Sequence, residues 1–254
     1  MENFKIEIDG DGIALLTFDV PGRSMNTITA GVMRDLAAFA ERLKTDESVK
    51  GAVIASGKPT GFCAGADLGE MNQSAGREGD KSDPEAGLKA AFDNAFSLNK
   101  TLRALETCGK PVACALEGLA LGGGLEIALA CHYRVSADNP KIQFGLPESK
   151  VGLLPGAGGT QRLPRLIGVQ NAAMMILQGE SKNPQEAKGL GFINEVVPAG
   201  QTIAAAKAWV KANPKAQAPW DAKGYRVKDG PYTPAGGMTF IGGNAMLGKT
   251  TYGN

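Results

Sequence analysis

Three consecutive glycines, Gly122 to Gly124, join an apolar strand to an apolar helix, and this turn restricts the possible fold most strongly. The strand is predicted over Pro111–Leu116, and the helix continues to Cys131. An earlier segment, Gly51–Asp67, has the same order of buried strand and glycine-containing turn. Because buried strands alternate with helices along the chain, the sequence predicts an α/β fold.

Hydrophobic spacing predicts the other elements of this fold. Asp9–Gly12 is a hairpin signal, and Thr29 is predicted to cap a helix whose apolar residues recur from Val32 to Leu43. Other strands are predicted at Lys5–Ile8, Ile13–Phe18, Gly51–Ala55, Tyr133–Ser136, Lys141–Phe144 and Ile193–Val197. Other helices are predicted at Pro84–Thr107, Gly159–Ile167, Asn171–Gln178, Pro184–Gly189 and Ile203–Ala212.

The chain is predicted to form one domain followed by a segment of different composition. Residues 1–213 contain all of these elements, and a chain with 43% hydrophobic residues can bury a large core. Residues 214–254 are rich in proline and glycine and lack helical periodicity, which predicts a linker or a truncated C-terminal segment of a longer polypeptide. Residues 72–84 are small and polar, and we expect a mobile surface loop there, a candidate lid.

Charge and cysteine content exclude several classes of function. The chain has 27 basic and 26 acidic residues without a basic stripe, so neither nucleic-acid binding nor membrane-surface binding has electrostatic support. No apolar run is long enough to span a membrane, and the N-terminus lacks the pattern of a signal peptide. The four cysteines form no CxxC pair. We therefore expect buried, reduced thiols in a cytoplasmic protein.

Metal and nucleotide cofactors are not predicted. His132 is the only histidine, so a zinc site that uses two histidines is impossible. It ends an apolar helix, where we expect it to have a structural role. No GxGxxG motif occurs. Gly243–Thr250 matches the phosphate-loop pattern, but too few residues follow to form the helix that such a loop requires.

Two glutamates give the glycine turns a chemical interpretation. The turn at Gly122 can present unpaired backbone N–H groups at a helix start, where they would stabilise an oxyanion. Glu126 lies within the apolar helix, and Glu148 follows a proline. Carboxylates beside such a hole suggest proton transfer at a carbon next to a polarised carbonyl. Taken singly, the turns could serve packing alone, Glu126 could satisfy a nearby turn, and Glu148 could be a solvated surface acid.

Four motifs resemble the enoyl-CoA hydratase/isomerase superfamily, also called the crotonase superfamily. They occur in the order of that superfamily, and the resemblance extends from about residue 4 to residue 213. The motifs are Phe62–Leu68, Leu119–Glu126, Gly145–Glu148 and Pro155–Leu163. In addition, Pro219–Gly224 resembles the linker after the hydratase part of bacterial multifunctional fatty-acid oxidation α-subunits. In those subunits a 3-hydroxyacyl-CoA dehydrogenase part follows.

The resemblance implies a crotonase-like ββα superhelix that binds an acyl-CoA thioester, with coenzyme A as part of the substrate and no separate cofactor. It implies that the amides of Ala66 and Gly123 form the oxyanion hole. Glu126 would activate a water for attack at Cβ, and Glu148 would deliver a proton to Cα. The implied substrate-binding residues are Ala64, Asp67, Leu68, Gly69, Gly122 and Gly156.

The implied reaction is hydration of trans-2-enoyl-CoA to 3-hydroxyacyl-CoA in fatty-acid β-oxidation. A cis-3/trans-2-enoyl-CoA isomerase is the nearest alternative, although isomerases of this family often keep only one of the two glutamates. An acyl-CoA-binding module without turnover is another alternative. The implied partners are further copies of the chain in a trimer, or a thiolase subunit in the full-length enzyme.

The sequence departs from the family pattern in four places. Gly69 replaces a lysine that many hydratases place near the CoA phosphates, and His132 replaces a common aspartate. Two extra residues lie between the glutamates, near Ala137–Pro140. The C-terminal helices that cover the acyl site in the family are not evident, so we expect an open acyl pocket.

Overall fold

The computed structural model describes residues 1–59, 61–70, 84–230, 233–234, 236–238 and 242. Its larger sheet has six strands in the order β1-β2-β3-β5-β7-β10. They are β1 (Phe4–Ile8), β2 (Ile13–Phe18), β3 (Gly51–Ser56), β5 (Val112–Leu116), β7 (Tyr133–Ala137) and β10 (Glu195–Val197). Only β1 and β2 are antiparallel, as the predicted hairpin requires, and the other neighbours are parallel.

A second, smaller sheet has the order β4-β6-β8-β9. Its strands are β4 (Gly61–Cys63), β6 (Leu119–Leu121), β8 (Phe144–Gly145) and β9 (Ser181–Lys182). The helices are α1 (Ala30–Thr45), α3 (Pro84–Glu106), α4 (Gly123–Ala130), α5 (Gly159–Ile167), α6 (Val169–Gln178), α7 (Pro184–Leu190) and α8 (Thr202–Ala212), with 3-10 helices η1 (Pro147–Val151) and η2 (Pro219–Asp221).

The two sheets are built by a repeated unit of two strands and a helix. β3 joins the larger sheet, β4 joins the smaller one, and α3 follows; β5, β6 and α4 repeat this order. β7 and β8 then add the next strand to each sheet before α5. Because the strands from β2 to β10 are parallel, the strands that successive units add to the larger sheet end at the same edge of it.

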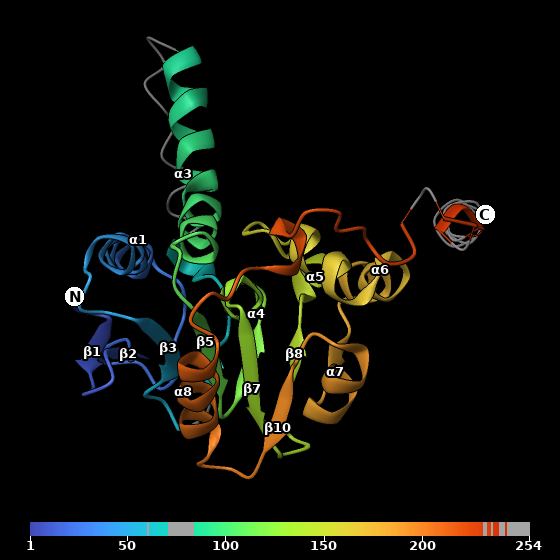
Figure 1. Ribbon diagram of the computed structural model, residues 1–254. Coiled ribbons are helices and arrows are strands. Elements are labelled where there is room, and N and C mark those ends of the chain that lie inside the picture. The colour runs from blue at the N-terminus through green and yellow to red at the C-terminus, as the bar shows by residue number, and fades with distance from the viewer. Residues whose placement is uncertain (60, 71–83, 231–232, 235, 239–241, 243–254) are drawn as a thin grey trace.

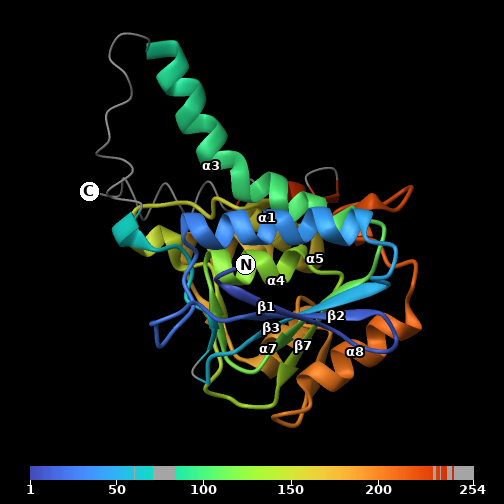
Figure 2. The ribbon, with the colours of Figure 1, turned by 90° about the vertical axis from the view of Figure 1, so that its left-hand side faces the viewer.

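The larger sheet is covered on both faces, which explains its apolar strands. Successive side chains point to opposite faces. Val53 and Ala113 pack with Val210 of α8, whereas Ile54 and Cys114 belong to the main core. Figure 2 shows α8 on one side of the sheet and α1, α4 and α5 on the other.

Helix α3 belongs to the core only at its C-terminal end. Leu102 and Leu105 are fully buried, whereas Leu88 is 73% exposed and Phe92 is 62% exposed. Figures 1 and 2 show the N-terminal part of this helix projecting from the body. The buried end is therefore the part that can position groups near α4 and α5.

Most predicted elements are confirmed, with bounds that differ by a few residues. Thr29 caps α1, because its side chain accepts a hydrogen bond from the Val32 amide. The strand predicted at Lys141–Phe144 is wrong except at its last residue, because the Ile142 amide bonds to the Asn139 carbonyl in a turn after Pro140. The glycine-rich loop before Asp67 contains β4, which the sequence did not predict.

The predictions for the C-terminal segment are only partly covered by the described residues. Residues 219–225 contact the domain: Asp221 forms an ion pair with Arg103, and the Tyr225 hydroxyl donates to the Arg165 carbonyl. Helical residues also occur at 234, 236–238 and 242. The division at residue 213 stays a prediction. The candidate lid at residues 72–84, except for residue 84, and the phosphate-loop match at Gly243–Thr250 lie outside the described residues.

Candidate active site

The triple-glycine turn begins α4, and its first and third positions require glycine. Gly122 has φ of 52°. A Cβ atom at Gly123 would lie 2.6 Å from Cδ1 of Ile28, and one at Gly124 would lie 2.4 Å from the carbonyl oxygen of Cys63. The backbone contact leaves no space for a side chain at Gly124, whereas a side chain at Gly123 would displace the end of Ile28. The start of α4 is therefore pressed against the neighbouring loop and against β4.

The loop that contains Ala66 lies beside this turn. Gly65 has φ of 102°, and a Cβ atom there would lie 3.7 Å from the Gly123 nitrogen. Ile28 bridges the loop: its amide donates to the Gly65 carbonyl, and its carbonyl accepts from the Asp67 amide. This pairing does not use the Ala66 amide. The two amides that the resemblance assigns to the oxyanion hole therefore come from adjacent loops, and that role stays a prediction.

Glu126 is buried in α4, with 2% of its surface exposed. Its Oε1 accepts hydrogen bonds from the amides of Ala157, at 2.8 Å, and Gly159, at 2.7 Å. Burial raises the pKa of Glu126 to about 7, although the Gly159 hydrogen bond opposes this and the negative charge of Glu148 adds to it. The carboxyl can therefore gain or lose a proton near neutral pH. These two amides were not predicted as partners of Glu126, although they lie in the Pro155–Leu163 motif.

Glu148 lies against Gly122 of the glycine turn, on η1 and not in an irregular loop. Its Oε1 would be 3.0 Å from a Cβ atom at Gly122. Its Oε2 is buried and has no hydrogen-bond partner among the described residues. Burial raises the pKa of this carboxyl as well. The side chain is therefore not the solvated surface acid that its sequence position alone would suggest.

The two carboxyls and the glycine turn form one site. Glu148 lies against Gly122, and the Glu126 Oε2 atom would lie 3.9 Å from a Cβ atom at Gly123. The charge of Glu148 also affects the pKa of Glu126. Both hydrogen bonds from backbone amides to Glu126 use Oε1, so Oε2 is the oxygen that can hold a water. This arrangement can transfer protons next to a group that accepts hydrogen bonds from backbone amides.

The remaining candidate residues lie along the exposed side of the Ala66 loop and in the loop before α5. Ala64, Gly69 and Gly156 are exposed, and Leu68 is 50% exposed. Asp67 already has partners, because it accepts the amide of Gly69 and pairs with Arg23, a residue that the sequence reasoning did not single out. Substrate contacts of these residues, and of Gly122 in the turn, stay predictions.

His132 has the structural role that was predicted. Its Nδ1 accepts the Val112 amide at 3.0 Å, so Nε2 carries the proton and donates to the Glu106 carbonyl at 3.1 Å. Burial lowers the pKa of the imidazole. The four cysteines are free and buried. Within the described part of the chain, no cluster of three potential metal-binding side chains occurs, and no helix has the length and apolar character needed to cross a membrane.

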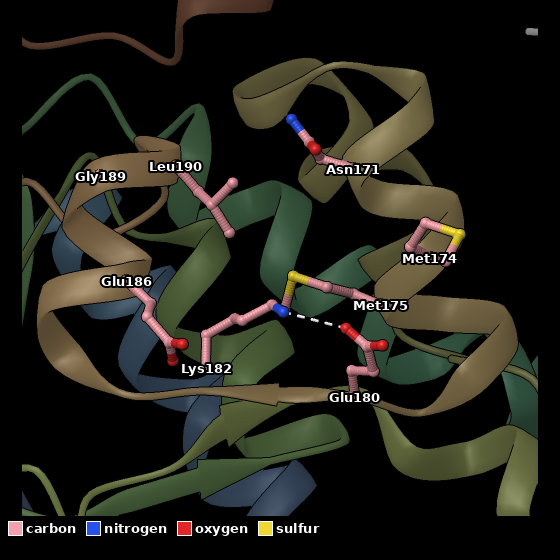
Figure 3. Close-up of a pocket in the computed structure, with 8 residues that line it drawn as sticks. All are labelled: Asn171, Met174, Met175, Glu180, Lys182, Glu186, Gly189 and Leu190. Carbon is pink, nitrogen blue, oxygen red and sulfur yellow. Dashed lines mark hydrogen bonds and ion pairs between the residues drawn. The ribbon is translucent and has the colours of Figure 1, made fainter.

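Figure 3 shows a different cavity, between α6 and α7, where Lys182 pairs with Glu180. Met175 and Leu190 also line it. Neither glutamate of the glycine turn belongs to its lining. This cavity is therefore separate from the candidate active site.

Solved structures place the fold in the crotonase class. The chain resembles the enoyl-CoA hydratase of Bacillus anthracis with a TM-score of 0.71 and 29% identity, over 83% of this chain and 76% of that one. It resembles DspI of Pseudomonas aeruginosa with a TM-score of 0.71 and 30% identity, over 97% of this chain and 94% of that one. The predicted ββα superhelix is thus confirmed.

The chain belongs to the enoyl-CoA hydratase/isomerase family, whose pattern matches residues 9–219. A fatty acid oxidation complex subunit alpha from Idiomarina loihiensis is 45% identical over 195 residues, which are 77% of this chain and 26% of that protein. The subunit from Shewanella oneidensis is 42% identical over 202 residues, 80% of this chain and 27% of that protein. The chain therefore spans about a quarter of the length of these relatives.

Proposed function

We propose that this chain hydrates trans-2-enoyl-CoA thioesters to 3-hydroxyacyl-CoA, as a step of fatty-acid β-oxidation. One observation carries the proposal: the carboxyls of Glu126 and Glu148 flank a glycine turn that can present backbone amides. Family membership and the relatives in fatty acid oxidation complexes support the same reaction. Water addition needs both a proton acceptor and a proton donor, and this site has two carboxyls with raised pKa values.

In the proposed mechanism the amides of Ala66 and Gly123 bind the thioester oxygen. Ionised Glu126 accepts a proton from water as the water oxygen attacks Cβ. The electrons of the double bond move toward the thioester carbonyl and form an enolate, which the two amides stabilise. Protonated Glu148 then donates its proton to Cα. A single donor in such a hole typically contributes about 2.7–4 kcal/mol.

The substrate also supplies the only coenzyme in this proposal, since CoA is part of the thioester. We propose that Ala64 and Asp67–Gly69 line the CoA side, with Gly122 and Gly156 next to the reacting atoms. The exposed loop around Leu68 supports this placement. In a longer polypeptide the domain would belong to a multifunctional enzyme with a thiolase-subunit partner, or it would form a trimer. We propose a cytoplasmic location.

A direct hydration assay tests this function. Crotonyl-CoA and decenoyl-CoA are incubated with the protein, and the ultraviolet absorbance of the enoyl thioester is followed. The proposal expects absorbance loss with formation of the 3-hydroxyacyl-CoA product. Tight acyl-CoA binding by calorimetry without any absorbance loss would instead indicate a binding module.

The isomerase alternative shares the oxyanion hole but needs one acid-base group. The site at Glu148 favours hydration, because a second carboxyl, one oxygen of which is buried, is available to donate a proton. Incubation with a cis-3-enoyl-CoA separates the two reactions. If this substrate is converted to trans-2-enoyl-CoA while crotonyl-CoA is not hydrated, the chain is an isomerase.

A further inference from the structure

The loop that holds Glu126 is itself held by a buried ion pair. Ala157 and Gly159 lie just before or at the start of α5, and their amides donate to Glu126 Oε1. Arg162, in the first turn of α5, reaches back along this loop and donates from Nη1 to the Ala157 carbonyl at 2.8 Å. Ala157 is thus fixed on both sides: its N–H points to Glu126 and its carbonyl to Arg162.

Glu106, at the end of α3, fixes the guanidinium of Arg162. Its carboxylate accepts two hydrogen bonds from Arg162, one from Nε at 2.6 Å and one from Nη2 at 3.0 Å. The side chains of Arg162 and Glu106 are 8% and 2% exposed. A two-point pair of this kind determines the plane of the guanidinium. The third donor, Nη1, is therefore aimed at the loop.

The fit between this guanidinium and the loop is close. A Cβ atom at Gly158 would lie 2.1 Å from Nη1 of Arg162, and Gly158 has φ of 100°. Asn99 of α3 also lies next to Gly158, with its Oδ1 3.2 Å from the same Cβ position, and it donates to the Gly156 carbonyl. The loop is therefore tied to α3 at two points, directly by Asn99 and through Arg162 by Glu106.

From this geometry we propose that Arg162, oriented by Glu106, is a positioning residue that aims the loop amides at the Glu126 carboxyl. Since the proposal concerns the acid-base role of Glu126, it rests on the proposed function. The charged groups that act on Glu126 are Glu148 from η1 and Arg162 from α5. Without Arg162, the loop would lose its carbonyl anchor, and Glu126 would lose both well-placed donors and a nearby positive charge.

The test replaces the whole pair, because removing one partner would leave a buried charge unpaired. In the double variant Glu106→Leu/Arg162→Met, apolar side chains fill the space that the ion pair occupied. Arg103→Gln is the matched control: Arg103 also donates to Glu106, at 3.2 Å, but it is bound to Asp221 on the surface and does not reach the loop. Thermal unfolding monitored by circular dichroism establishes that both variants are folded.

In the folded double variant we expect kcat for crotonyl-CoA hydration to fall about 100-fold, because small displacements of a catalytic group have effects of this size. KM should change by less than about threefold. Arg103→Gln should remain within about twofold of the original chain, because the two hydrogen bonds from Arg162 to Glu106 remain. The proposal would be overturned if kcat of the double variant equalled that of the original chain, or if Arg103→Gln lost as much kcat as the double variant.

A second measurement does not depend on turnover. Carboxyl ¹³C NMR of glutamate-labelled protein, with the Glu126 signal assigned by Glu126→Gln, follows the titration of this group. We expect its midpoint to rise by about one pH unit in the double variant, because hydrogen bonds and a positive charge that favour the carboxylate are lost. An unchanged midpoint overturns the positioning role. If the original chain does not hydrate crotonyl-CoA, the proposed function fails while this titration still decides the positioning role.

Discussion

Glu126 and Glu148 lie at the same glycine turn, but the fold holds them differently. Glu126 is nearly inaccessible and accepts two backbone amides on one oxygen. Glu148 is on a short 3-10 helix, is partly exposed, and has a buried Oε2 without a hydrogen-bond partner among the described residues. One carboxyl is therefore fixed in orientation by hydrogen bonds, whereas the other has a buried oxygen whose hydrogen-bonding capacity is unused among the described residues.

This difference suits two different proton-transfer roles. A base that orients a water benefits from a fixed carboxylate whose charge is stabilised by amide donors. A proton donor benefits from an environment that keeps the carboxyl neutral, and a buried oxygen without a partner favours the neutral form. Burial raises the pKa of both carboxyls, so the base role proposed for Glu126 and the acid role proposed for Glu148 differ in their hydrogen-bond contacts and not in the direction of the pKa shift.

The largest expected effect is that of Glu126→Gln. The glutamine Oε1 can still accept the amides of Ala157 and Gly159, so the protein should fold, but it cannot accept a proton from water. We expect kcat for crotonyl-CoA hydration to fall by about 10⁴-fold, the upper range for acid-base groups. Glu117→Gln is the control, because Glu117 also accepts a backbone amide, that of Gly200. Full activity in Glu126→Gln would show that the base is another group.

The next effect concerns the contact between the turn and Glu148. In Gly122→Ala the new Cβ atom would meet Glu148 Oε1 at 3.0 Å, so we expect kcat to fall by about 10²-fold through displacement of the carboxyl. Gly109→Ala is the control for a side chain at positive φ, because Gly109 has φ of 79° and nothing within 4 Å of its Cβ position. If both variants lose the same activity, backbone strain and not the Glu148 contact is responsible.

The third effect is a pH dependence set by Glu126, whose pKa is about 7. The base must be ionised and the proton donor must be protonated, so kcat/KM should follow a bell-shaped curve that rises as Glu126 ionises and falls as Glu148 loses its proton. Crotonyl-CoA hydration measured between pH 5 and 9 checks this. In Glu148→Gln the titration midpoint of Glu126 should move to lower pH, because a negative charge that raises it is removed. An unchanged midpoint would mean that the two carboxyls do not interact.

The same pKa has the opposite consequence for stability. The folded pKa of Glu126 lies above its unfolded value of about 4.5, so the folded state binds the proton more tightly. The tighter binding of this proton adds to the free energy of unfolding. The added stability is complete below the unfolded pKa and is lost as pH rises through about 7. Glu126→Gln should lack this decline when denaturant unfolding is compared at pH 5 and pH 8.

The smallest expected effect is on stability in Glu148→Gln. An amide cannot ionise, so the cost of a buried carboxylate disappears, and the free energy of unfolding at pH 8 should rise by about 1 kcal/mol or less. Urea unfolding measures this change. A marked loss of stability would mean that the Glu148 carboxylate has a stabilising partner in the fold.

Much of this site could be predicted because its signals are local in the sequence. Three glycines before an apolar helix predict a tight helix start, and the structure has a positive φ at Gly122 and close contacts at the next two glycines. Alternating and helical hydrophobic spacing predicted most elements, because side-chain periodicity follows directly from backbone geometry. The error at Lys141–Phe144 arose where a short turn replaced a strand.

The contacts of the glutamates could not be predicted in this way. Glu126 accepts hydrogen bonds from Ala157 and Gly159, which follow it by 31 and 33 positions in the chain. Arg162 forms an ion pair with Glu106 across 56 positions. No periodicity encodes such distances, since they depend on how α3, α4 and α5 pack. The sequence alone thus determined the alternation of strands and helices, the glycine turn and the presence of two acidic side chains. Only the tertiary structure decided which backbone groups meet each carboxyl, because hydrogen bonds between distant segments form only once the core has brought them together.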